Sequence, residues 1–580
     1  MYVEKVPNRK SPPAILIRES FRKDGKVKKR TIANITNLPE ELILLITENI
    51  QGNKINRDEV FEVISSLQHG NIAAVKLAMQ KLSISNLLSS QQSREKKIIL
   101  SLICMRIIRP ESKLATSDWW NNTTIKEEFG LEEDLNVDHI YKAMDWLLKS
   151  KTRIEKKLAK RHLDKKASHI MYDLSSSYFE GQNCPLARRG YSRDRKKGKL
   201  QVNYGLLTNQ QGVPVSVDIF PGNTSDSKTF LSQAKKARED YQIQKIVFIG
   251  DRGMIGQGAI DAMNKEKDMA WITALKAQTI KKLIKRGEIM LSAEDQEKEA
   301  ENIFEIFHPD YPKERLIVCR NFPLAQHRRK TRENLIQKTE EDLEKIQIKI
   351  GEEKLSKESD IALKIGEVIN KYKVKKYFNL KIEKNSFSYT KDQETIKEEK
   401  DLDGIYVIRT SLNKEEMKKE KVVRSYKDLS EVEIAFRSLK TEDLHIRPIY
   451  HYNADRVKAH IFLCMLSYYV TWHMKEILKP FLFADEELEK NKASSNPVKV
   501  VKRSDKAKQK DSMRVNRVDG ETIPVRKWPA LLENLSTIQR NECRYKDFSK
   551  KRASFFLDTK KSSYQEKVFQ HLKKISLPER

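Results

Sequence analysis

The chain has 580 residues, of which 38% are hydrophobic and 33% are charged, and its formal net charge at pH 7 is +30. No run of about 18 apolar residues occurs, so the composition excludes a membrane-spanning helix. A net positive charge of this size destabilises the folded chain through self-repulsion unless a polyanion offsets it. Nucleic acid is therefore the predicted partner, with an anionic membrane surface as the alternative.

The cysteines argue for a reducing compartment. Their number is odd and they are widely scattered without any CxxC pair, which fits neither a disulfide framework nor a zinc site. The N-terminal string MYVEKVPNRKSPP lacks the apolar segment of a signal peptide. We expect a cytoplasmic, nucleoid-associated protein with three to five domains.

The first two predicted units are a β-arm and a helical domain. The string FRKDGKVKK contains an Asp-Gly dipeptide between alternating segments, which is a hairpin signal. It predicts a basic β-arm over residues 1–56. Over residues 57–165 apolar residues recur at three- and four-residue steps, which predicts a helical domain with basic faces. This domain is either DNA-binding or a plain helical bundle.

Residues 166–275 change character and predict a mixed sheet. The strings HIMYDLSSSYFEG, KLQVNYGLLT and VPVSVDIF read as antiparallel strands, and KIVFIGD and MAWITALK read as later strands, each preceded by a helix. The order β-β-β-α-β-α-β predicts an α/β fold, an RNase H-like mixed sheet with flanking helices. This range is the first part of that core.

The core is predicted to be interrupted and then resumed. Residues 276–424 combine a long charged helix with strands such as YFNLKIEKNSFSYTKD, and a stretch of this length is an insertion subdomain rather than a loop. Helical patterns over residues 425–480 form the second part of the core. Residues 481–580 are a basic C-terminal region, in which we expect residues 499–510 to be a nonspecific anchor or disordered.

Two aspartates occupy equivalent positions on different apolar strands. Asp173 follows IMY, and Asp251 follows IVFIG. Groups at strand ends line the crevice of an open α/β sheet, and adjacent strands lie about 4.8 Å apart. Two carboxylates at that spacing raise one another's pKa unless a cation neutralises them, and Mg²⁺ takes such oxygen ligands. The pair therefore predicts a metal site, to which Glu431 or Glu433 of YKDLSEVEIAFRSLK adds a third acid.

Each acid taken alone has a structural explanation. An aspartate at the end of a strand is often a turn or cap residue, and Glu433 alone reads as a solvated helix residue. Asp218, in VSVDIFPGN, is a further candidate, for which a loop-edge carboxylate is the preferred interpretation. Only the joint placement of these acids in one sheet favours catalysis.

Several strings together resemble a known family: YDLSSSYFEG, RGYSRDRKKGKLQVNYGLL, GVPVSVDIFPGNTSDSKTF, FIGDRGM and RPIYHYNADRVKAHIFL. They resemble the DDE transposases of bacterial insertion sequences, and most of all the group with the signature Y-x2-R-x3-E-x6-K. The signature maps onto Tyr426, Glu433 and Lys440, with Leu429 at the arginine position. Lys427 or Arg424 replaces the missing phosphate contact, or the contact is absent.

The resemblance implies a function and a site. Asp173, Asp251 and Glu433 would be the catalytic triad and would hold two Mg²⁺ ions per site, with Mn²⁺ as a substitute. The reaction would be DNA cleavage and strand transfer at terminal inverted repeats by a homodimer in a synaptic complex on double-stranded DNA. Two alternatives remain: a metal-dependent nuclease on the same core, and a catalytically decayed DNA-binding protein, which Leu429 favours.

A basic segment, ARRGYSRDRKKGK at residues 187–199, connects the first two core strands. Arginine binds phosphate in a bidentate manner, so DNA contact is the first interpretation and a solvated loop is the alternative. The resemblance adds the tyrosine and the lysine of the signature. The expected DNA-binding residues are Tyr426, Lys440, Arg188, Arg189, Arg193, Arg195, Lys196, Lys197 and Lys199.

Overall fold

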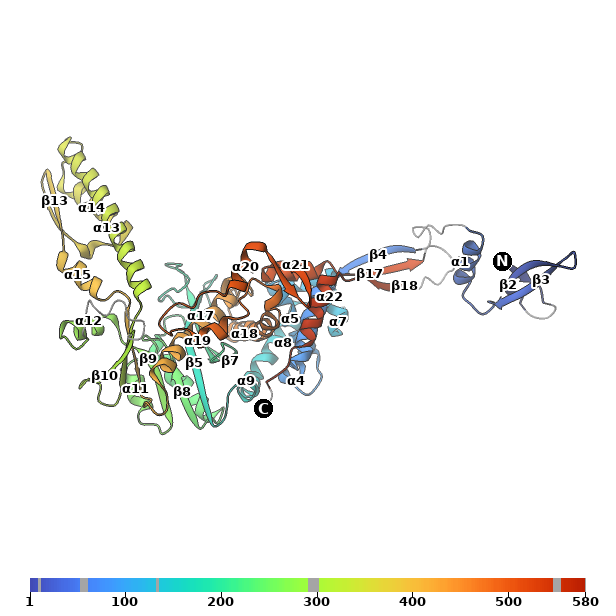
Figure 1. Ribbon diagram of the computed structural model, residues 1–580, viewed down its shortest axis with the longest axis horizontal. Coiled ribbons are helices and arrows are strands. Elements are labelled where there is room, and N and C mark those ends of the chain that lie inside the picture. Colours follow the sequence, from blue (N-terminus) through green and yellow to red (C-terminus); the bar gives the residue numbers. More distant parts are fainter. Residues whose placement is uncertain (9–11, 53–60, 132–134, 290–301, 546–553, 579–580) are drawn as a thin grey trace.

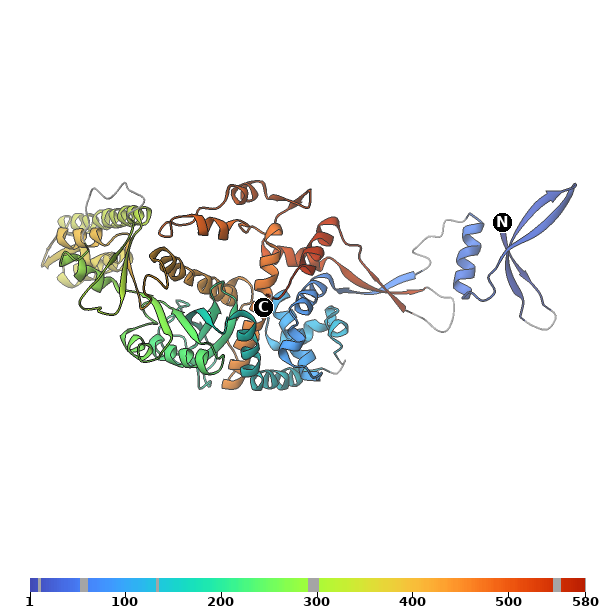
Figure 2. The same ribbon diagram turned by 60° about the horizontal axis from the view of Figure 1, so that its bottom comes forward.

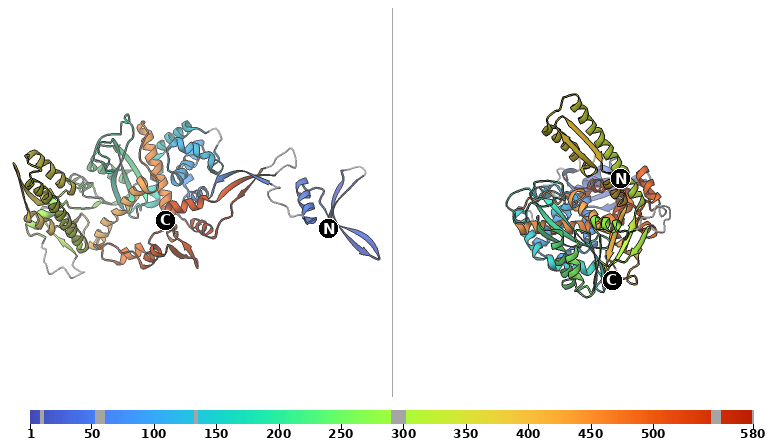
Figure 3. Two further views of the ribbon diagram at one scale, coloured as in Figure 1. Left: turned by 90° about the horizontal axis from the view of Figure 1, so that it is seen from above. Right: turned by 90° about the vertical axis from the view of Figure 1, so that its left-hand side faces the viewer.

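The structure is a computed structural model, and it describes residues 1–8, 12–52, 61–131, 135–289, 302–545 and 554–578. The molecule is elongated (Figure 1). A central body of helices and sheet lies between a small N-terminal module at one end and a helical projection at the other, and this order is the same in Figure 2 and in the left view of Figure 3.

An eight-stranded mixed sheet forms the core, with the strand order β10-β11-β14-β9-β8-β5-β6-β7. Strands β5, β6 and β7 form an antiparallel meander, and β8 and β9 continue the sheet parallel to β5. The predicted succession of strands and helices over residues 166–275 is confirmed. The strands are β5 (Ala167–Tyr178), β6 (Gln201–Asn209), β7 (Pro214–Pro221), β8 (Lys245–Ile249), β9 (Met269–Ala274), β10 (Ile303–Ile306), β11 (Arg315–Arg320) and β14 (Ile405–Thr410).

Helices cover both faces of this sheet, which explains its continuous apolar runs. The string KIVFI of β8 is almost entirely buried, as expected for a parallel strand covered on both sides. Helix α18 is apolar around most of its circumference, and it lies between the sheet and the helical domain (Figure 2). The helices of the core are α10 (Asp226–Glu239), α11 (Gln257–Met263), α12 (Ala277–Lys285), α16 (Lys419–Lys427), α17 (Leu429–Arg437) and α18 (Ala454–Ile477).

The segment expected to be an insertion serves two parts of the molecule. Strands β10, β11 and β14 join the core sheet beyond β9, so only the middle of the segment forms a separate subdomain. That subdomain has its own hydrophobic core around Leu343, Ile361 and Phe387. It projects from the body in Figure 1 and consists of α13 (Phe322–Gly351), α14 (Glu358–Tyr372), β12 (Phe378–Glu383), β13 (Ser386–Lys391) and α15 (Gln393–Asp401).

The helical domain lies beside the sheet and shares one hydrophobic core with it. Its predicted helical pattern is observed, except that the range expected to be helical from residue 57 begins with a strand, β4 (Phe61–Gln68). That strand pairs with a partner more than 470 residues away, which no local pattern reveals. The helices are α3 (Gly70–Lys81), α4 (Ile84–Leu88), α5 (Arg94–Ile108), α6 (Lys113–Trp119), α7 (Ile125–Phe129), α8 (Val137–Lys149) and α9 (Lys151–His162).

The two ends of the chain meet in a three-stranded ribbon with the order β18-β17-β4, beyond which lies the N-terminal module (Figure 1). The basic C-terminal region is folded and returns to the helical domain, where α21 and α22 pack on α3. The expected disorder over residues 499–510 is not observed, because α20 begins within that stretch. The remaining elements are β1 (Tyr2–Val6), β2 (Ala14–Lys23), β3 (Lys26–Asn34), α1 (Glu40–Ile50), α19 (Leu488–Ser494), α20 (Asp505–Met513), β15 (Val515–Val518), β16 (Glu521–Pro524), α21 (Trp528–Ser536), β17 (Gln539–Tyr545), β18 (Ser554–Asp558) and α22 (Ser563–Lys573).

Two further expectations concern the cysteines and the membrane. All five cysteines, Cys104, Cys184, Cys319, Cys464 and Cys543, are buried free thiols. Within the described ranges, no helix combines the length and apolarity needed to cross a bilayer.

Candidate active site

The register of two parallel strands brings Asp173 and Asp251 to one edge of the sheet. Met171 of β5 pairs with Ile249 at the end of β8. Asp173 and Asp251 each lie two residues further along, so they occupy matching positions just beyond the last paired residues. This is the carboxyl end of β8, where ligands bind in open α/β sheets.

The alternation of side chains along β5 points Asp173 toward α17. Tyr172 contacts Phe230 of α10, so its neighbour Asp173 faces the opposite side of the sheet. That side is covered by α17, because Tyr204, which is paired with Ser175 in register, contacts Phe436 of α17. The helix that carries Glu433 therefore lies over the face of the sheet that carries Asp173.

Tyr426 connects the second aspartate to the glutamate. Burial raises the pKa of Tyr426 to about 12, and the negative charges of Asp251 and Glu433 both act in the same direction. The phenol is thus within the electrostatic reach of both carboxylates and of Arg252, whose charge lowers its pKa. The residues alone leave Glu431 and Glu433 open, the family resemblance favours Glu433, and the contacts of the two side chains differ. Glu431 forms an ion pair with Lys492 at 2.8 Å, whereas Glu433 is exposed and makes no ion pair with a described residue.

A further carboxylate, Asp226, belongs to this edge and was missed in the sequence. It is the first residue of α10, where it reads as an ordinary helix-start acid. Burial raises the pKa of Asp173 to about 7. The charge of Asp251 and that of Asp226 also raise this pKa, whereas the charge of Arg193 lowers it. The edge therefore holds at least three interacting carboxylates and one guanidinium.

The donor set suits a hard divalent cation. Asp173, Asp251 and Glu433 offer only carboxylate oxygens, the ligands preferred by Mg²⁺ and its relatives. Among the residues that the structure describes, no three His, Cys, Asp or Glu side chains are gathered closely enough to hold a metal ion. In this structure the described side chains of Asp173, Asp251 and Glu433 therefore do not form a closed ligand set.

The basic segment 187–199 is pinned to this edge through its single acid. The side chain of Asp194 is 1% exposed and accepts the backbone N–H of Tyr178 at 3.0 Å. Lys440 lies 3.0 Å from Asp194 Oδ1, and Arg447 also pairs with that oxygen. Lys440 lies in a π-helical turn, Ser438–Glu442, that directly follows α17. In this structure the signature lysine is bound to an internal partner, and its contact with DNA stays a prediction.

The other predicted DNA-binding residues of this segment divide into two groups. Arg193 pairs with Asp226 and Lys199 pairs with Glu180, while Arg188 donates to the carbonyl of Ala187. Four side chains are exposed and form no ion pair with a described residue, and Tyr191 beside them is 83% exposed. This unpaired group consists of Arg189, Arg195, Lys196 and Lys197.

The departure from the signature at Leu429 has a structural explanation. Leu429 packs against the shared hydrophobic core. Both proposed substitutes are bound to internal partners in this structure, because Arg424 donates to the carbonyls of Lys492 and Ser495, and Lys427 donates to that of Val498 at 2.7 Å, so their contact with a phosphate stays a prediction. Arg424 and Lys427 thus stabilise the end of α19 and the segment after it. The arginine position of the signature holds Leu429, which has no charge to offer.

Asp218 has a structural role, but it is not the loop-edge carboxylate that we expected, because it lies within strand β7 and pairs in register with Gly205. Its carboxylate accepts Lys151 at 2.9 Å and Lys236 at 3.0 Å. Although burial opposes it, the charges of these two lysines hold the pKa of Asp218 well below its usual range.

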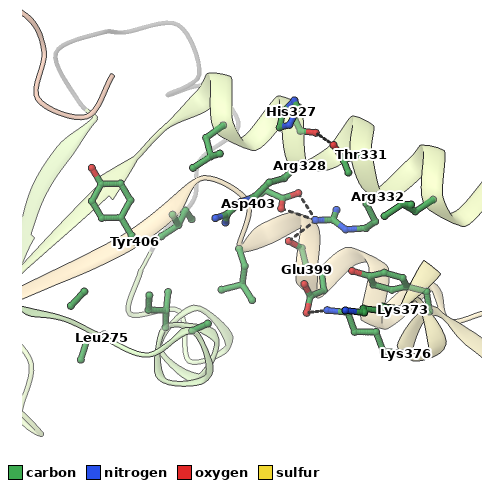
Figure 4. A pocket seen from close by; sticks show the side chains of 18 of the residues that line it. Leu275, His327, Arg328, Thr331, Arg332, Lys373, Lys376, Glu399, Asp403 and Tyr406 are labelled. Carbon is green, nitrogen blue, oxygen red and sulfur yellow. Dashed lines mark hydrogen bonds and ion pairs between the residues drawn. The ribbon is translucent and has the colours of Figure 1, made fainter. Parts of the chain in front are cut away.

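A cavity of about 1060 Å³ extends from Asp251 and Tyr426 toward the insertion subdomain. Its far wall is made by α13 and by the segment after α14 (Figure 4). Arg332 bonds to Asp403 at 2.6 Å, and Lys376 pairs with Glu399 at 2.8 Å. The remaining cations of the lining, Arg252, Arg328 and Lys373, form no ion pair with a described residue. The cavity therefore joins the acidic edge to a positively charged wall.

Comparisons with known proteins agree with this picture. Residues 164–470 match the transposase DDE domain, and residues 3–59 match the N-terminal domain of IS1634 family transposases. No curated protein matches the chain. Among solved structures, the piggyBac transposase synaptic complex with hairpin DNA is similar, with a TM-score of 0.32 and 8% identity over 69% of this chain and 72% of that chain. A likeness this weak carries no argument about this chain.

The match to the DDE domain covers more than half of the 580 residues and includes Asp173, Asp251 and Glu433. Transposases of this family act on DNA and use divalent metal ions. The chain belongs to the DDE transposases.

Proposed function

We propose that this transposase recognises the terminal inverted repeats of an insertion sequence, cuts the DNA there and joins the ends to a target. The catalytic domain would be an RNase H-like core. The strand order β7-β6-β5-β8-β9, three antiparallel strands followed by two parallel ones, supports this. Strands β14, β11 and β10 would be an extension of that core.

The observation that carries the proposal is the meeting of three elements at one edge. The register of β5 and β8 places Asp173 beside Asp251, and α17 covers the face of β5 that carries Asp173. Tyr426 lies within the electrostatic reach of Asp251 and Glu433. These observations support a shared site for metal-dependent phosphoryl transfer, built from acids that lie far apart in the chain.

Asp173, Asp251 and Glu433 would hold two Mg²⁺ ions, for which Mn²⁺ would substitute. When bound, such ions activate the attacking hydroxyl and stabilise the leaving oxygen. The protein's own contribution is to keep three acids at one edge, with Asp173 buried enough for its pKa to reach about 7 without a cation.

The unpaired cations define where DNA would lie. Arg189, Arg195, Lys196 and Lys197 belong to the same segment as Arg193, whose charge acts on Asp173, and Arg328 and Lys373 line the cavity that begins at Asp251. Arginine and lysine side chains without acidic partners are free to neutralise phosphates. We infer that DNA passes between the segment 187–199 and the insertion subdomain.

The N-terminal module supports assembly into a homodimer. In the described part of residues 1–52, the only buried hydrophobic side chain is that of Ile35, whereas Val27, Ile32 and Leu42 are exposed. A module of this size with so small a described core has only marginal stability of its own. It therefore needs a further surface, which we assign to a second copy of the chain bound to the other end of the element.

The test is a cleavage assay with DNA from the ends of the element that encodes the chain. Cleavage should require Mg²⁺ or Mn²⁺. Asp173→Asn, Asp251→Asn and Glu433→Gln should each slow it by about 10³-fold, because losing a metal ligand removes several kcal/mol of transition-state stabilisation. Binding to the ends should persist in all three variants.

Glu431→Gln is the matched control, since it changes an acid of the same helix that pairs with Lys492. It should leave cleavage intact. If Glu433→Gln still cleaves and Glu431→Gln does not, the third catalytic acid is Glu431. Cleavage without joining to a target would indicate a nuclease instead of a transposase.

A further inference from the structure

Arg193 is held beside the acidic edge by its backbone and by its side chain. Its N–H donates to the hydroxyl of the buried Ser176 on β5 at 3.1 Å. The next residue, Asp194, is fixed by Lys440 and Arg447. The guanidinium is thereby brought close enough to Asp173 to lower the pKa of that carboxyl.

Asp226 completes this arrangement. Its Oδ1 accepts Arg193 Nη2 at 2.5 Å. Its other oxygen, Oδ2, lies 3.8 Å from the position that a Cβ would take on Gly253, and Asp251 Oδ1 lies 3.0 Å from the same position. Asp226 and Asp251 thus both lie against Gly253. The ion pair between Asp226 and Arg193 belongs to the site and not to a distant surface.

The pair leaves most of the guanidinium available. A guanidinium has five N–H donors, and the bond to Asp226 uses one Nη2 donor. Arg193 makes no other side-chain hydrogen bond to a described residue, and its side chain is partly exposed. The remaining donors can bind a phosphate in a bidentate manner while the carboxylate still holds the group in place.

We propose that Asp226 is a positioning residue that holds the Arg193 guanidinium where it binds a phosphate of the DNA at the Asp173–Asp251 edge. The inference rests on the proposed function. Asp226 acts through Arg193 and does not itself touch DNA. Its loss leaves a mobile arginine at the place where the substrate has to be oriented.

The test is a double-mutant cycle on cleavage by the full chain. Single-turnover cleavage of end DNA is measured for Asp226→Asn, for Arg193→Ala and for the double variant. Each single variant should lower the rate on the order of 10²-fold, as misplacement of a substrate-orienting group does. The double variant should be no slower than Arg193→Ala, because Asp226 acts only through Arg193. The DNA concentration for half-maximal rate should change by less than about threefold, since the segment keeps its other cations.

Asp505→Asn is a matched control. Asp505, like Asp226, is the first residue of a helix and follows an N-cap serine, but it is 98% exposed and pairs only with Lys508. Both substitutions remove the same charge from a helix start, and only the one at Asp226 should slow cleavage. Asp226→Glu keeps the carboxylate and should restore at least part of the rate lost in Asp226→Asn.

Three results would overturn the inference. If the effects of Asp226→Asn and Arg193→Ala multiply in the double variant, Asp226 acts independently of the arginine. If Asp226→Asn is slow only at low metal concentration and recovers at high Mn²⁺, the residue is a metal ligand. If Asp226→Asn cleaves like the unmodified chain, the pair has no role in the reaction. Failure of the unmodified chain to cleave with either metal would instead overturn the proposed function.

Discussion

Two stretches of this transposase are similarly basic, but they differ in how many of their cations have acidic partners. Residues 187–199 and residues 499–510 are both rich in lysine and arginine. In the second stretch the cations find acids nearby: Arg503 pairs with Asp511, Lys506 with Glu486 and Lys508 with Asp505. In the first, the single acid Asp194 is taken by cations from other elements. Arg193 and Lys199 pair with acids outside the stretch, and Arg189, Arg195, Lys196 and Lys197 are left for a ligand.

The difference shows that a count of basic residues does not locate a DNA-binding surface. Lys510 is the clearest case. Its side chain is 2% exposed, and it donates to the carbonyls of Leu482 and Ala484 and to Glu486. Its charge is used inside the protein. Arg195 and Lys197, by contrast, are exposed and make no ion pair with a described residue.

The largest effect is expected when the anchor of the first stretch is removed. Asp194→Asn should lower the free energy of unfolding by about 3 kcal/mol, because breaking a buried ion pair leaves Lys440 and Arg447 as uncompensated charges. Urea unfolding of the full chain measures the loss, and hydrogen exchange at residues 187–199 should rise with it. Unchanged exchange there would show that this acid does not pin the segment. Lys440→Met added to Asp194→Asn should restore part of the stability.

Lys510→Met probes the second stretch by removing a cation buried inside it. We expect a loss of about 2 kcal/mol, since carbonyl groups that it satisfies would be left without a donor. The midpoint of urea unfolding measures this. The salt dependence of DNA binding should not change. A lower salt slope for Lys510→Met would mean that this side chain reaches DNA after all.

A smaller effect is expected when the unpaired cations of the first stretch are removed. The triple variant Arg195→Ala, Lys196→Ala and Lys197→Ala should fold normally and bind DNA more weakly. The slope of log affinity against log salt concentration should fall by about 0.9 for each phosphate that the variant no longer neutralises. Fluorescence anisotropy at several salt concentrations gives the slope. An unaltered slope would mean that residues 187–199 form a solvated loop that does not contact DNA.

The smallest effect is expected from the paired cations of the second stretch. Lys506→Ala with Lys508→Ala should change the free energy of unfolding by less than about 0.5 kcal/mol, because exposed ion pairs contribute little. The salt slope should stay within error of that of the unmodified chain. A fall in slope as large as that of the triple variant would erase the contrast between the two stretches.

Much of the site could be predicted because its signals are local. The apolar runs around Asp173 and Asp251 identify buried strands. The spacing of Tyr426, Glu433 and Lys440 can be counted in the sequence and compared with the signature. The order of strands and helices over residues 166–275 follows from the same patterns. The extension of the sheet by β14 and the pairing of β4 with β17 did not follow, since both depend on segments distant in the chain.

Sequence alone therefore determined the family and the mixed sheet and named the candidate acids, because apolar periodicity and short motifs act over a few residues. Only the tertiary structure decided which charges are free. It assigned Lys440 to Asp194, Glu431 to Lys492 and Asp226 to Arg193. The physical reason is that an ion pair depends on distance in space, and each of these partners comes from another element of the fold.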